Sequence, residues 1–253
     1  MVRRYVRHIA LAEIGAAGQE RLARSRVAVV GLGALGGHIA LHLARSGVGH
    51  IRIIDRDIVE EENLQRQVLY DEDDVRAGLP KAVAAAQRLA SVNSSVKIDP
   101  RIAALRSDNA RMLLSDCDIV LDGTDNLETR FLINDFCVRY GVPWVFGAVL
   151  ATSGLVAPIA PHRTPCLRCI FRQIPPSTVL PTCQTCGVLN TAPALIAALQ
   201  TTLAYRILLG KHPDQKLLFV DLWKMSFFDV EIARWQECPA CIKNEFEFLK
   251  GGR

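Results

Sequence analysis

The sequence lacks the features that mark several large protein classes. No apolar stretch reaches the roughly 18–20 residues that a membrane helix needs, because the longest candidate, 192–209, is interrupted by Gln200 and Arg206. The N-terminal segment has no apolar core of the kind found in signal peptides. The net charge of +4 is small and no Lys/Arg tract occurs, which argues against a nucleic-acid partner. We therefore expect a cytoplasmic protein that binds neither membrane nor nucleic acid.

The composition is ordinary for an α/β protein. Of the 253 residues, 50% are hydrophobic and 22% are charged. There is no internal repeat and no low-complexity segment. In a cytosolic protein, eight cysteines favour metal or thiol chemistry over a disulfide framework.

Strand-like and helical segments alternate through the first 150 residues. A short apolar run, typical of a buried parallel strand, occurs at 26–30, and further strands are predicted at 50–55, 96–102, 119–121 and 144–149. Helical spacing occurs in the amphipathic segment 1–25 and at 35–46, 81–91, 108–114 and 127–140. This alternation predicts an α/β fold with a doubly wound, mostly parallel sheet.

The pattern changes after about residue 150. Residues 153–160 are strand-like, a Pro-containing loop follows, and 192–209 reads as a buried helix. Residues 216–222 and 226–232 resemble the two strands of an antiparallel hairpin. We expect a C-terminal antiparallel extension of the sheet and a frayed tail at 251–253.

A glycine-rich turn, Gly31-Leu32-Gly33-Ala34-Leu35-Gly36, lies between the first predicted strand and the next helix. Such a turn lets the backbone approach a phosphate at the positive end of a helix. Asp55, at the end of the next strand, stands where a carboxylate accepts hydrogen bonds from a ribose. The alternative to nucleotide binding is that the glycines only allow the strand to pack closely against the helix. The motif itself does not distinguish a hydride-transfer cofactor from ATP.

Charged and amide residues after Asp55 favour ATP. Asp57, the stretch Asn63-Leu64-Gln65-Arg66-Gln67 and Lys81 follow in turn. A nicotinamide ring needs no such cluster, whereas Arg and Lys neutralise charge on phosphoryl oxygens. These residues predict a triphosphate site.

Thr124-Asp125-Asn126 follows the predicted strand at 119–121. Ligands of open α/β sheets bind at this carboxyl edge, and a carboxylate there suits Mg²⁺ bridging phosphates. As an isolated triplet, the same residues would more often cap a helix.

Two Cys-x-x-Cys pairs predict a metal site. Cys166 with Cys169, and Cys238 with Cys241, can close a tetrahedral zinc site with no open position. Such a site is structural. The alternative is a pair of redox motifs.

The other four cysteines lie in different sequence environments. Cys183 and Cys186 form a third Cys-x-x-Cys spacing in a Pro-rich stretch, where Pro181, Thr182 and Gln184 favour exposure. Cys117, at a strand start, and Cys137, on an apolar helix face, are expected to be core thiols.

Together these motifs resemble the ThiF/MoeB family, bacterial relatives of the ubiquitin-activating enzymes. The resemblance covers nearly the whole chain and is carried by Arg4-Tyr5-x-Arg7-x-Ile9, the glycine turn, Asp55-x-Asp57, Asn63 to Gln67, Lys81, Thr124-Asp125-Asn126, Pro165-Cys166-x-x-Cys169, Thr182-Cys183, Gly187-Val188 and Cys238-Pro239-x-Cys241. Ala34 stands where the family often has a further glycine.

The resemblance implies a Rossmann-like ATP site in a homodimer and a structural zinc ion on the four cysteines. It implies one adenylating domain over 1–253, made of an N-terminal helical segment (1–25), a nucleotide-binding half (26–150) and a zinc-containing carrier-binding half (151–253). The activity implied is adenylation of the C-terminal glycine of a small ubiquitin-like sulfur-carrier protein of ThiS or MoaD type, ending in Gly-Gly. A separate sulfur donor is then needed.

Specific residues follow from motifs and resemblance together. For the nucleotide we expect Gly31, Gly33, Ala34, Gly36, Asp55, Asp57, Asn63, Gln65, Arg66, Lys81, Asp125 and Asn126. Catalysis is expected from Arg66, Lys81 and Mg²⁺ on Asp125, because a peptide carboxylate is already ionised and needs no general base. The resemblance adds Arg7, which would reach the neighbouring subunit's nucleotide, and Cys183 as a thiol that can link to the carrier.

Three other functions remain open at this point. One is an NAD-dependent oxidoreductase, and another is the related tRNA-modifying dehydratase branch. The third is a zinc-stabilised thiol redox sensor without enzyme activity.

Overall fold

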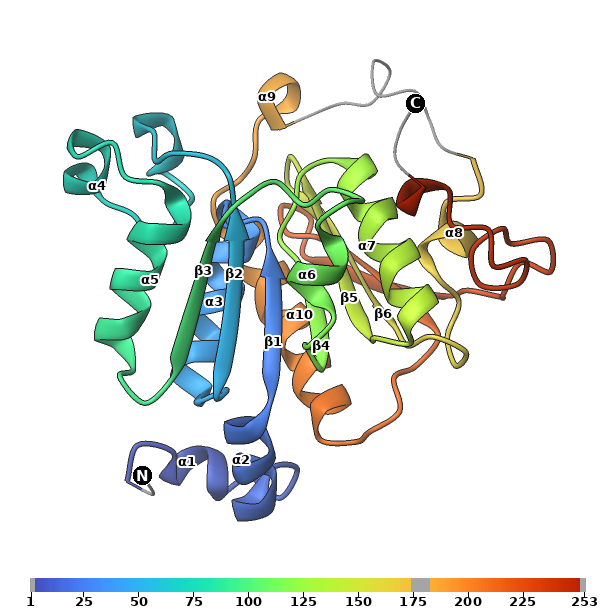
Figure 1. Cartoon of the computed structure of the whole chain (residues 1–253), viewed down its shortest axis with the longest axis horizontal. Helices are drawn as coiled ribbons and strands as arrows, with labels where there is room; N and C mark the ends of the chain where they lie inside the picture. Colours follow the sequence, from blue (N-terminus) through green and yellow to red (C-terminus); the bar gives the residue numbers. More distant parts are fainter. Residues whose placement is uncertain (1–2, 174–182, 251–253) are drawn as a thin grey trace.

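In the part of the chain that the structure describes, eight strands form one continuous sheet (Figure 1). The computed structural model describes residues 3–173 and 183–250. The strands are β1 (Arg26–Val30), β2 (His50–Asp55), β3 (Lys97–Ile102), β4 (Ile119–Asp122), β5 (Trp144–Leu150), β6 (Ser153–Ile159), β7 (Lys216–Asp221) and β8 (Ser226–Glu231), in the order β3-β2-β1-β4-β5-β6-β7-β8. The first five pair in parallel and β6 to β8 pair antiparallel. The predicted α/β fold with an antiparallel extension is confirmed.

Helices cover both faces of the sheet (Figure 1). One face packs against α3 (Ala34–Ser46), α5 (Lys81–Val92) and α10 (Thr191–Leu208), and the other against α6 (Ala110–Leu114) and α7 (Leu127–Tyr140). Side chains alternate along each strand, so Val27 and Val29 of β1 join the first layer while Ala28 and Val30 join the second. Because both of their sides are buried, the central strands β1 and β4 are almost entirely apolar in sequence.

Several short elements lie outside the predicted pattern: η1 (Glu61–Asn63), α4 (Glu72–Arg76), α8 (Leu167–Ile170), α9 (Cys183–Cys186) and η2 (Glu247–Leu249). The predicted N-terminal helical segment contains two helices, α1 (Val6–Ile9) and α2 (Gly15–Arg24). The Tyr5 hydroxyl accepts a hydrogen bond from Asn93 Nδ2 at 2.8 Å. Its ring lies against Gly47, where a Cβ would come within 2.4 Å. Tyr5 therefore anchors α1 beneath the end of α3.

Helix α10 confirms the buried helix predicted at 192–209. Gln200, the polar interruption, is fully buried, and its Nε2 donates to the carbonyls of Asp122 (2.9 Å) and Val145 (3.1 Å). The side chain thus satisfies backbone groups where β4 and β5 diverge. None of the helices that the structure describes combines the length and hydropathy needed to cross a bilayer.

The strand order reverses between β1 and β4, which is where open α/β sheets bind ligands. The turn after β1 touches the turn after β4 through glycine backbone. Gly31 has φ +84°, and a Cβ there would lie 2.7 Å from the Gly123 carbonyl oxygen. A Cβ on Gly36 would lie 1.8 Å from the Gly31 carbonyl oxygen. Glycine is therefore required at both positions by close backbone contact.

Two adjacent glycines of α3 test this contact. In Gly36→Ala the Cβ would clash with the Gly31 carbonyl oxygen and push α3 away from the turn that precedes it, so we expect the free energy of unfolding to fall by about 1–3 kcal/mol. Gly37→Ala is the matched control, because its Cβ would meet Leu69 only at 3.7 Å. A helix-interior alanine there should leave stability unchanged or raise it by up to about 1 kcal/mol. Urea unfolding of both variants measures the difference, and equal stabilities would contradict the close-contact reading.

Candidate active site

The first turn of α3 begins at the switch point. Gly33 is the N-cap of this helix and Ala34 is its first residue. A Cβ on Gly33 would meet only Gln67 Nε2, at 3.8 Å, so the backbone is accessible from this side. The free N–H groups and the positive end of a helix favour an anion, which fits the phosphate interaction predicted for Gly31 to Gly36.

Asp55 lies at the end of β2 and is nearly buried. Its Oδ2 accepts a hydrogen bond from Leu32 N at 2.6 Å and its Oδ1 from Asp57 N at 2.8 Å. Burial raises the pKa of Asp55, although these N–H groups and Lys81 act in the opposite direction. The carboxylate therefore holds the glycine turn in place, and each oxygen keeps acceptor capacity for a ribose hydroxyl.

Lys81 is the first residue of α5 and its side chain is almost fully buried. The ammonium Nζ lies 3.8 Å from Asp57 Oδ2, and Lys81 N donates to the Asp57 carbonyl at 2.8 Å. The buried Tyr70 hydroxyl donates to the Leu32 carbonyl at 2.9 Å and lies 3.4 Å from the Lys81 carbonyl. Tyr70 thus couples the glycine turn to the start of α5.

The predicted stretch from Asn63 to Gln67 contains both buried and exposed residues. Asn63 is buried, and its Oδ1 accepts a hydrogen bond from Glu60 N at 3.4 Å. Gln65 is exposed, and the half-buried Arg66 donates from Nη1 to the Glu62 carbonyl at 2.6 Å. Asn63 therefore shapes the turn that presents Arg66.

Gln67 is a further candidate, which was not among the individual residues expected to bind the nucleotide. It is buried, and its Oε1 has no hydrogen-bond partner among the residues that the structure describes. Its Nε2 is the nearest atom to the Cβ position of Gly33. The signal was present in the sequence, because Gln67 ends the same motif as Arg66.

A buried ion pair that sequence analysis did not predict lies beneath the turn after β4. Asp122 is 0% exposed, and its Oδ2 accepts from Arg130 Nε at 3.0 Å. Its Oδ1 accepts from Thr124 N (2.9 Å) and Oγ1 (2.7 Å). Arg130 Nη2 also donates to the carbonyls of Thr124 (2.5 Å) and Gly147 (3.1 Å). Burial raises the pKa of Asp122, and the Arg130 charge opposes that shift.

This pair sets the position of Asp125. The Asp125 side chain is exposed at the carboxyl edge, directly after the residues that Asp122 and Arg130 hold. Asn126 is the N-cap of α7, and its Oδ1 accepts from Thr129 N at 2.9 Å. The capping role that the sequence left open is thus present at Asn126, while Asp125 stays available for a metal ion.

One predicted residue, Arg7, is not brought to this cluster, and another, Cys183, is described only by its backbone. Arg7 is exposed on α1, which lies at the opposite edge of the sheet from the carboxyl ends of the parallel strands (Figure 1). Cys183 begins α9, which lies beyond those carboxyl ends (Figure 1), but its side chain is outside the described residues. Pro181, Thr182 and the tail at 251–253 are also outside them.

The four paired cysteines do converge. The sulfurs of Cys166 and Cys238 lie 3.5 Å apart, as do those of Cys169 and Cys241, and all four lie within 4.8 Å of one another. Tetrahedral thiolates about 2.3 Å from zinc are separated by roughly 3.8 Å, so the spacing fits that ion. Four sulfurs leave no open position, which fits a structural role.

The cysteine cluster connects to the α7 layer. Leu167 N, between two of the cysteines, donates to the buried Asn134 Oδ1 of α7 at 2.8 Å. Trp235 N donates to Cys169 Sγ at 3.4 Å. Hydrogen bonds to the sulfurs and to their backbone help orient the ligands. Cys117 and Cys137 are buried apart from the cluster, which confirms them as core thiols.

Comparison with known families agrees with these features. The model of the ThiF family matches residues 5–240. The chain belongs to the ThiF family. It is 40% identical over 251 residues to the sulfur carrier protein ThiS adenylyltransferase of Bacillus subtilis, covering 98% of this chain and 74% of that protein. It is also 40% identical over 240 residues to the SAMP-activating enzyme E1 of Haloferax volcanii, covering 94% of this chain and 88% of that protein.

Solved structures confirm the fold of this ThiF-family chain. The crystal structure of Escherichia coli MccB with ATP superposes with a TM-score of 0.79 at 22% identity, covering 94% of this chain and 74% of that one. MccB with MccA-N7isoASN gives a TM-score of 0.81 at 21% identity, with 95% and 74% covered.

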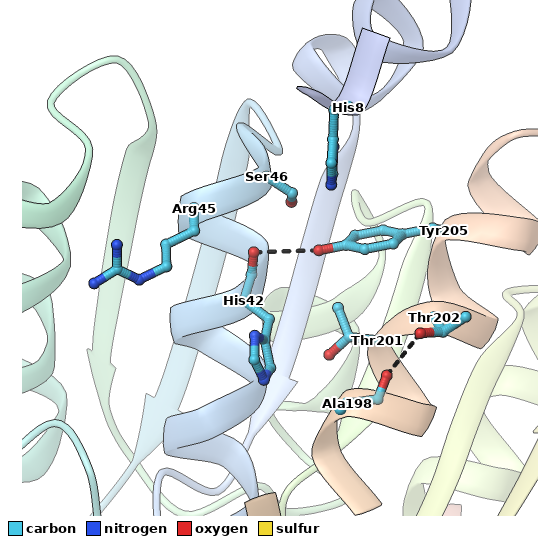
Figure 2. A pocket seen from close by; sticks show the side chains of 8 residues that line it. All are labelled: His8, His42, Arg45, Ser46, Ala198, Thr201, Thr202 and Tyr205. Atoms are coloured by element: carbon cyan, nitrogen blue, oxygen red, sulfur yellow. Dashed lines mark hydrogen bonds between the residues drawn. The ribbon is translucent and has the colours of Figure 1, made fainter. Parts of the chain in front are cut away.

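A cavity of this ThiF-family chain lies away from the nucleotide candidates. It measures about 280 Å³ and lies among α1, α3 and α10. Figure 2 shows its lining, which is His8, His42, Arg45, Ser46, Ala198, Thr201, Thr202 and Tyr205. The Tyr205 hydroxyl donates to the His42 carbonyl at 3.2 Å, and burial together with Arg45 lowers the pKa of His42. None of the predicted site residues lines this cavity.

The cysteine cluster predicts one zinc ion per chain. In Cys238→Ser the site loses a buried thiolate, so we expect most of the zinc to be lost. We also expect stability to fall by at least about 2 kcal/mol, a shift of roughly 4–8 °C in Tm. Cys186→Ser is the control, because Cys186 is exposed outside the cluster. Elemental analysis and thermal unfolding measure both effects, and full zinc occupancy in Cys238→Ser would refute the assignment.

Proposed function

We propose that this chain is an ATP-dependent adenylyltransferase that activates the C-terminal glycine carboxylate of a small ubiquitin-like sulfur-carrier protein. The observation that carries the proposal is the placement of the Lys81 ammonium 3.8 Å from Asp57, next to the Asp55 carboxylate that holds the glycine turn at the switch point of the sheet. Asp125 is exposed at the same carboxyl edge. The relatives support it, since they include sulfur carrier protein adenylyltransferases from Bacillus subtilis and Thermus thermophilus.

The proposed reaction joins two anions. A carboxylate oxygen of the carrier's C-terminus forms a bond to the α-phosphorus of ATP, and the bond from that phosphorus to the bridging β-oxygen breaks. The products are an acyl-adenylate and pyrophosphate. The pKa of a peptide C-terminus is about 3.3–3.7, so the nucleophile is ionised at neutral pH and no base is needed. Catalysis is therefore positioning and charge neutralisation.

The chain's own residues match that requirement. In our proposal Lys81 and Arg66 neutralise phosphoryl oxygens. The exposed Asp125 would hold Mg²⁺, which would supply further positive charge. Asp55 binds the ribose from the end of β2, and the backbone of Gly33 and Ala34 approaches the phosphates. Asp57, 3.8 Å from Lys81 Nζ, keeps that ammonium directed toward the site.

Zinc has a structural place in the proposal, held by the four clustered cysteines. The activated carrier would then receive sulfur from a separate donor, for thiamine, molybdopterin or related biosynthesis. In this scheme Cys183 acts after adenylation. Its sulfur would form a bond to the carbonyl carbon of the carrier's C-terminal glycine, the bond from that carbon to the phosphate oxygen would break, and AMP would leave.

We further propose a homodimer in which Arg7 serves the partner's nucleotide. Helix α10 is apolar on its outer side as well, where Leu195, Leu199 and Leu203 are half-buried in the single chain. A helix that is apolar all round is normally covered. This side continues into α1, since the rings of His8 and Tyr205 meet edge to face at 6.1 Å. A second copy on this surface would also explain why Arg7 lies far from its own site.

The first test removes the proposed charges. We expect Arg66→Ala, Lys81→Ala and Asp125→Ala each to slow carrier-dependent ATP–pyrophosphate exchange by roughly 10²–10³, since one such contact is worth about 2.7–4 kcal/mol of barrier. Fold and zinc content should be unchanged. Cys183→Ala is the matched contrast, because adenylation needs no thiol, so exchange should persist while later sulfur loading fails. Near-normal exchange in the three charge variants would refute these roles.

The second test asks whether Arg7 acts across a dimer. Arg7→Ala and Asp125→Ala should each be inactive alone. If Arg7 serves the partner's site, a heterodimer has one complete site of two. Random 1:1 mixing makes half of the dimers mixed, so about a quarter of wild-type exchange should return. No recovery after verified subunit mixing would place Arg7 outside the partner's site.

A further inference from the structure

Helix α7 connects the active-site edge to the cysteine cluster. Its first turn follows the loop that carries Asp125, and its side packs against α8, which contains Cys169 (Figure 1). Every residue of α7 from Arg130 to Val138 is buried. A helix that is enclosed in this way can shift only as a unit, so a contact on its side also fixes the position of its first turn.

The first contact between α8 and α7 is a hydrogen bond to Asn134. The Asn134 side chain is 0% exposed, and its Oδ1 accepts from Leu167 N, beside Cys166, at 2.8 Å. Asn134 and Arg130 are four residues apart, so their side chains lie on the same face of α7. A shift of Leu167 is therefore transmitted to the residue that pairs with Asp122.

The second contact runs through two aromatic rings. Phe171, the C-cap of α8, meets the buried Phe146 of β5 edge to face, with the ring centroids 5.9 Å apart. The guanidinium of Arg130 lies over the Phe146 ring, with its Cζ 5.5 Å from the ring centroid. Such a cation–π contact is stronger where water is excluded. The Phe146 ring thus helps to orient Arg130, and Phe171 holds that ring.

Both contacts lead to Arg130, which holds the turn before Asp125. Its Nη2 donates to the Thr124 carbonyl at 2.5 Å, and its Nε donates to Asp122 at 3.0 Å. The cysteines hold α8, and α8 in turn supports Arg130 by two separate routes. The position of the Asp125 carboxylate therefore depends on the cysteine cluster.

We propose that Asn134 and Phe171 are positioning residues through which the cysteine cluster supports the Asp125 loop, so that zinc binding and Mg²⁺–nucleotide binding are coupled. This inference rests on the proposed function. The coupling is reciprocal by thermodynamic necessity. Order at the cysteine cluster stabilises the Asp125 loop, and a nucleotide held at that loop stabilises the cluster against loss of its metal. Simple packing would contribute stability without this reciprocity.

Two variants interrupt the contacts, and two controls keep them. Asn134→Ala removes the hydrogen-bond acceptor, and Phe171→Ala removes the ring contact with β5. Phe171→Tyr is the conservative control, because it keeps the ring at a half-buried position. Tyr140→Ala removes a ring contact with Phe136, whose centroid is 4.7 Å away, at the far end of α7. This second control measures the effect of lost packing on the same helix.

The first measurement needs no nucleotide. We expect hydrogen exchange of residues 122–129, followed by mass spectrometry, to be about fivefold faster or more in Asn134→Ala and Phe171→Ala, as the loss of one buried contact implies. Both controls should exchange at the wild-type rate. Zinc content should be unchanged in all four variants, because the four clustered cysteines remain.

The second measurement tests the reciprocity. Zinc release to a colorimetric chelator is timed with and without saturating Mg²⁺-ATP, with magnesium in excess so that free nucleotide does not itself capture zinc. In the wild type and both controls, Mg²⁺-ATP should slow the release by about fivefold or more, the lower end of typical coupling between two sites. In Asn134→Ala and Phe171→Ala this slowing should be lost.

The outcomes separate this inference from the proposed function. Unchanged exchange over 122–129 in both test variants, or an equal rise in Tyr140→Ala, overturns the inference whatever ATP does. If calorimetry shows that Mg²⁺-ATP binds, yet it slows zinc release equally in all variants or in none, the coupling is also wrong. If exchange changes as expected but the wild type does not bind Mg²⁺-ATP, the proposed function is wrong, while the support of the Asp125 loop by the cysteine cluster stands.

Discussion

The candidate site depends on a backbone contact between the turns after β1 and β4. Gly31, Gly36 and Gly123 approach so closely that no side chain fits between them. The contact fixes where the first turn of α3 points. Asp55 and Tyr70 then hold Leu32, which follows Gly31, through its N–H and carbonyl. The acidic and basic side chains of β2, α5 and the turn after β4 are thus held in fixed positions relative to this backbone contact. Neutralising the charge of phosphates requires such fixed positions.

A second constraint lies one layer deeper, where β4 and β5 diverge. Gln200 from α10 satisfies carbonyls on one side, and the Asp122–Arg130 pair satisfies the turn on the other. A buried ion pair adds little net stability compared with apolar packing, but breaking it leaves a costly unpaired charge. We therefore interpret the role of the Asp122–Arg130 pair as positioning the turn after β4 rather than as adding stability. It orders the loop carrying Asp125 at an edge where regular sheet hydrogen bonding has ended.

Local patterns predicted the strands and longer helices because their periodicity reflects burial on each face. The spacing of the paired cysteines likewise predicted the metal cluster, since each Cys-x-x-Cys motif already places two sulfurs close together. Contacts between distant residues carry no local signal. Asp122 and Arg130 read as a strand end and a helix residue, and nothing in their spacing showed that they pair. The short helices α8 and α9 escaped prediction because four residues are too few to show a period.

The cysteine cluster gives the antiparallel half a mechanical role. It joins residues 166–169 to 238–241, and the chain between them contains α9, α10 and the β7–β8 hairpin. Closing so long a loop removes much of the freedom of the unfolded chain. A zinc ion on these thiolates would therefore hold the hairpin at a set distance from α7 and from the site. In the proposed reaction the two halves of the sheet must hold a set position relative to the nucleotide, so an error in that distance would disturb the site. The metal would thus support catalysis by geometry alone, without touching the reacting atoms.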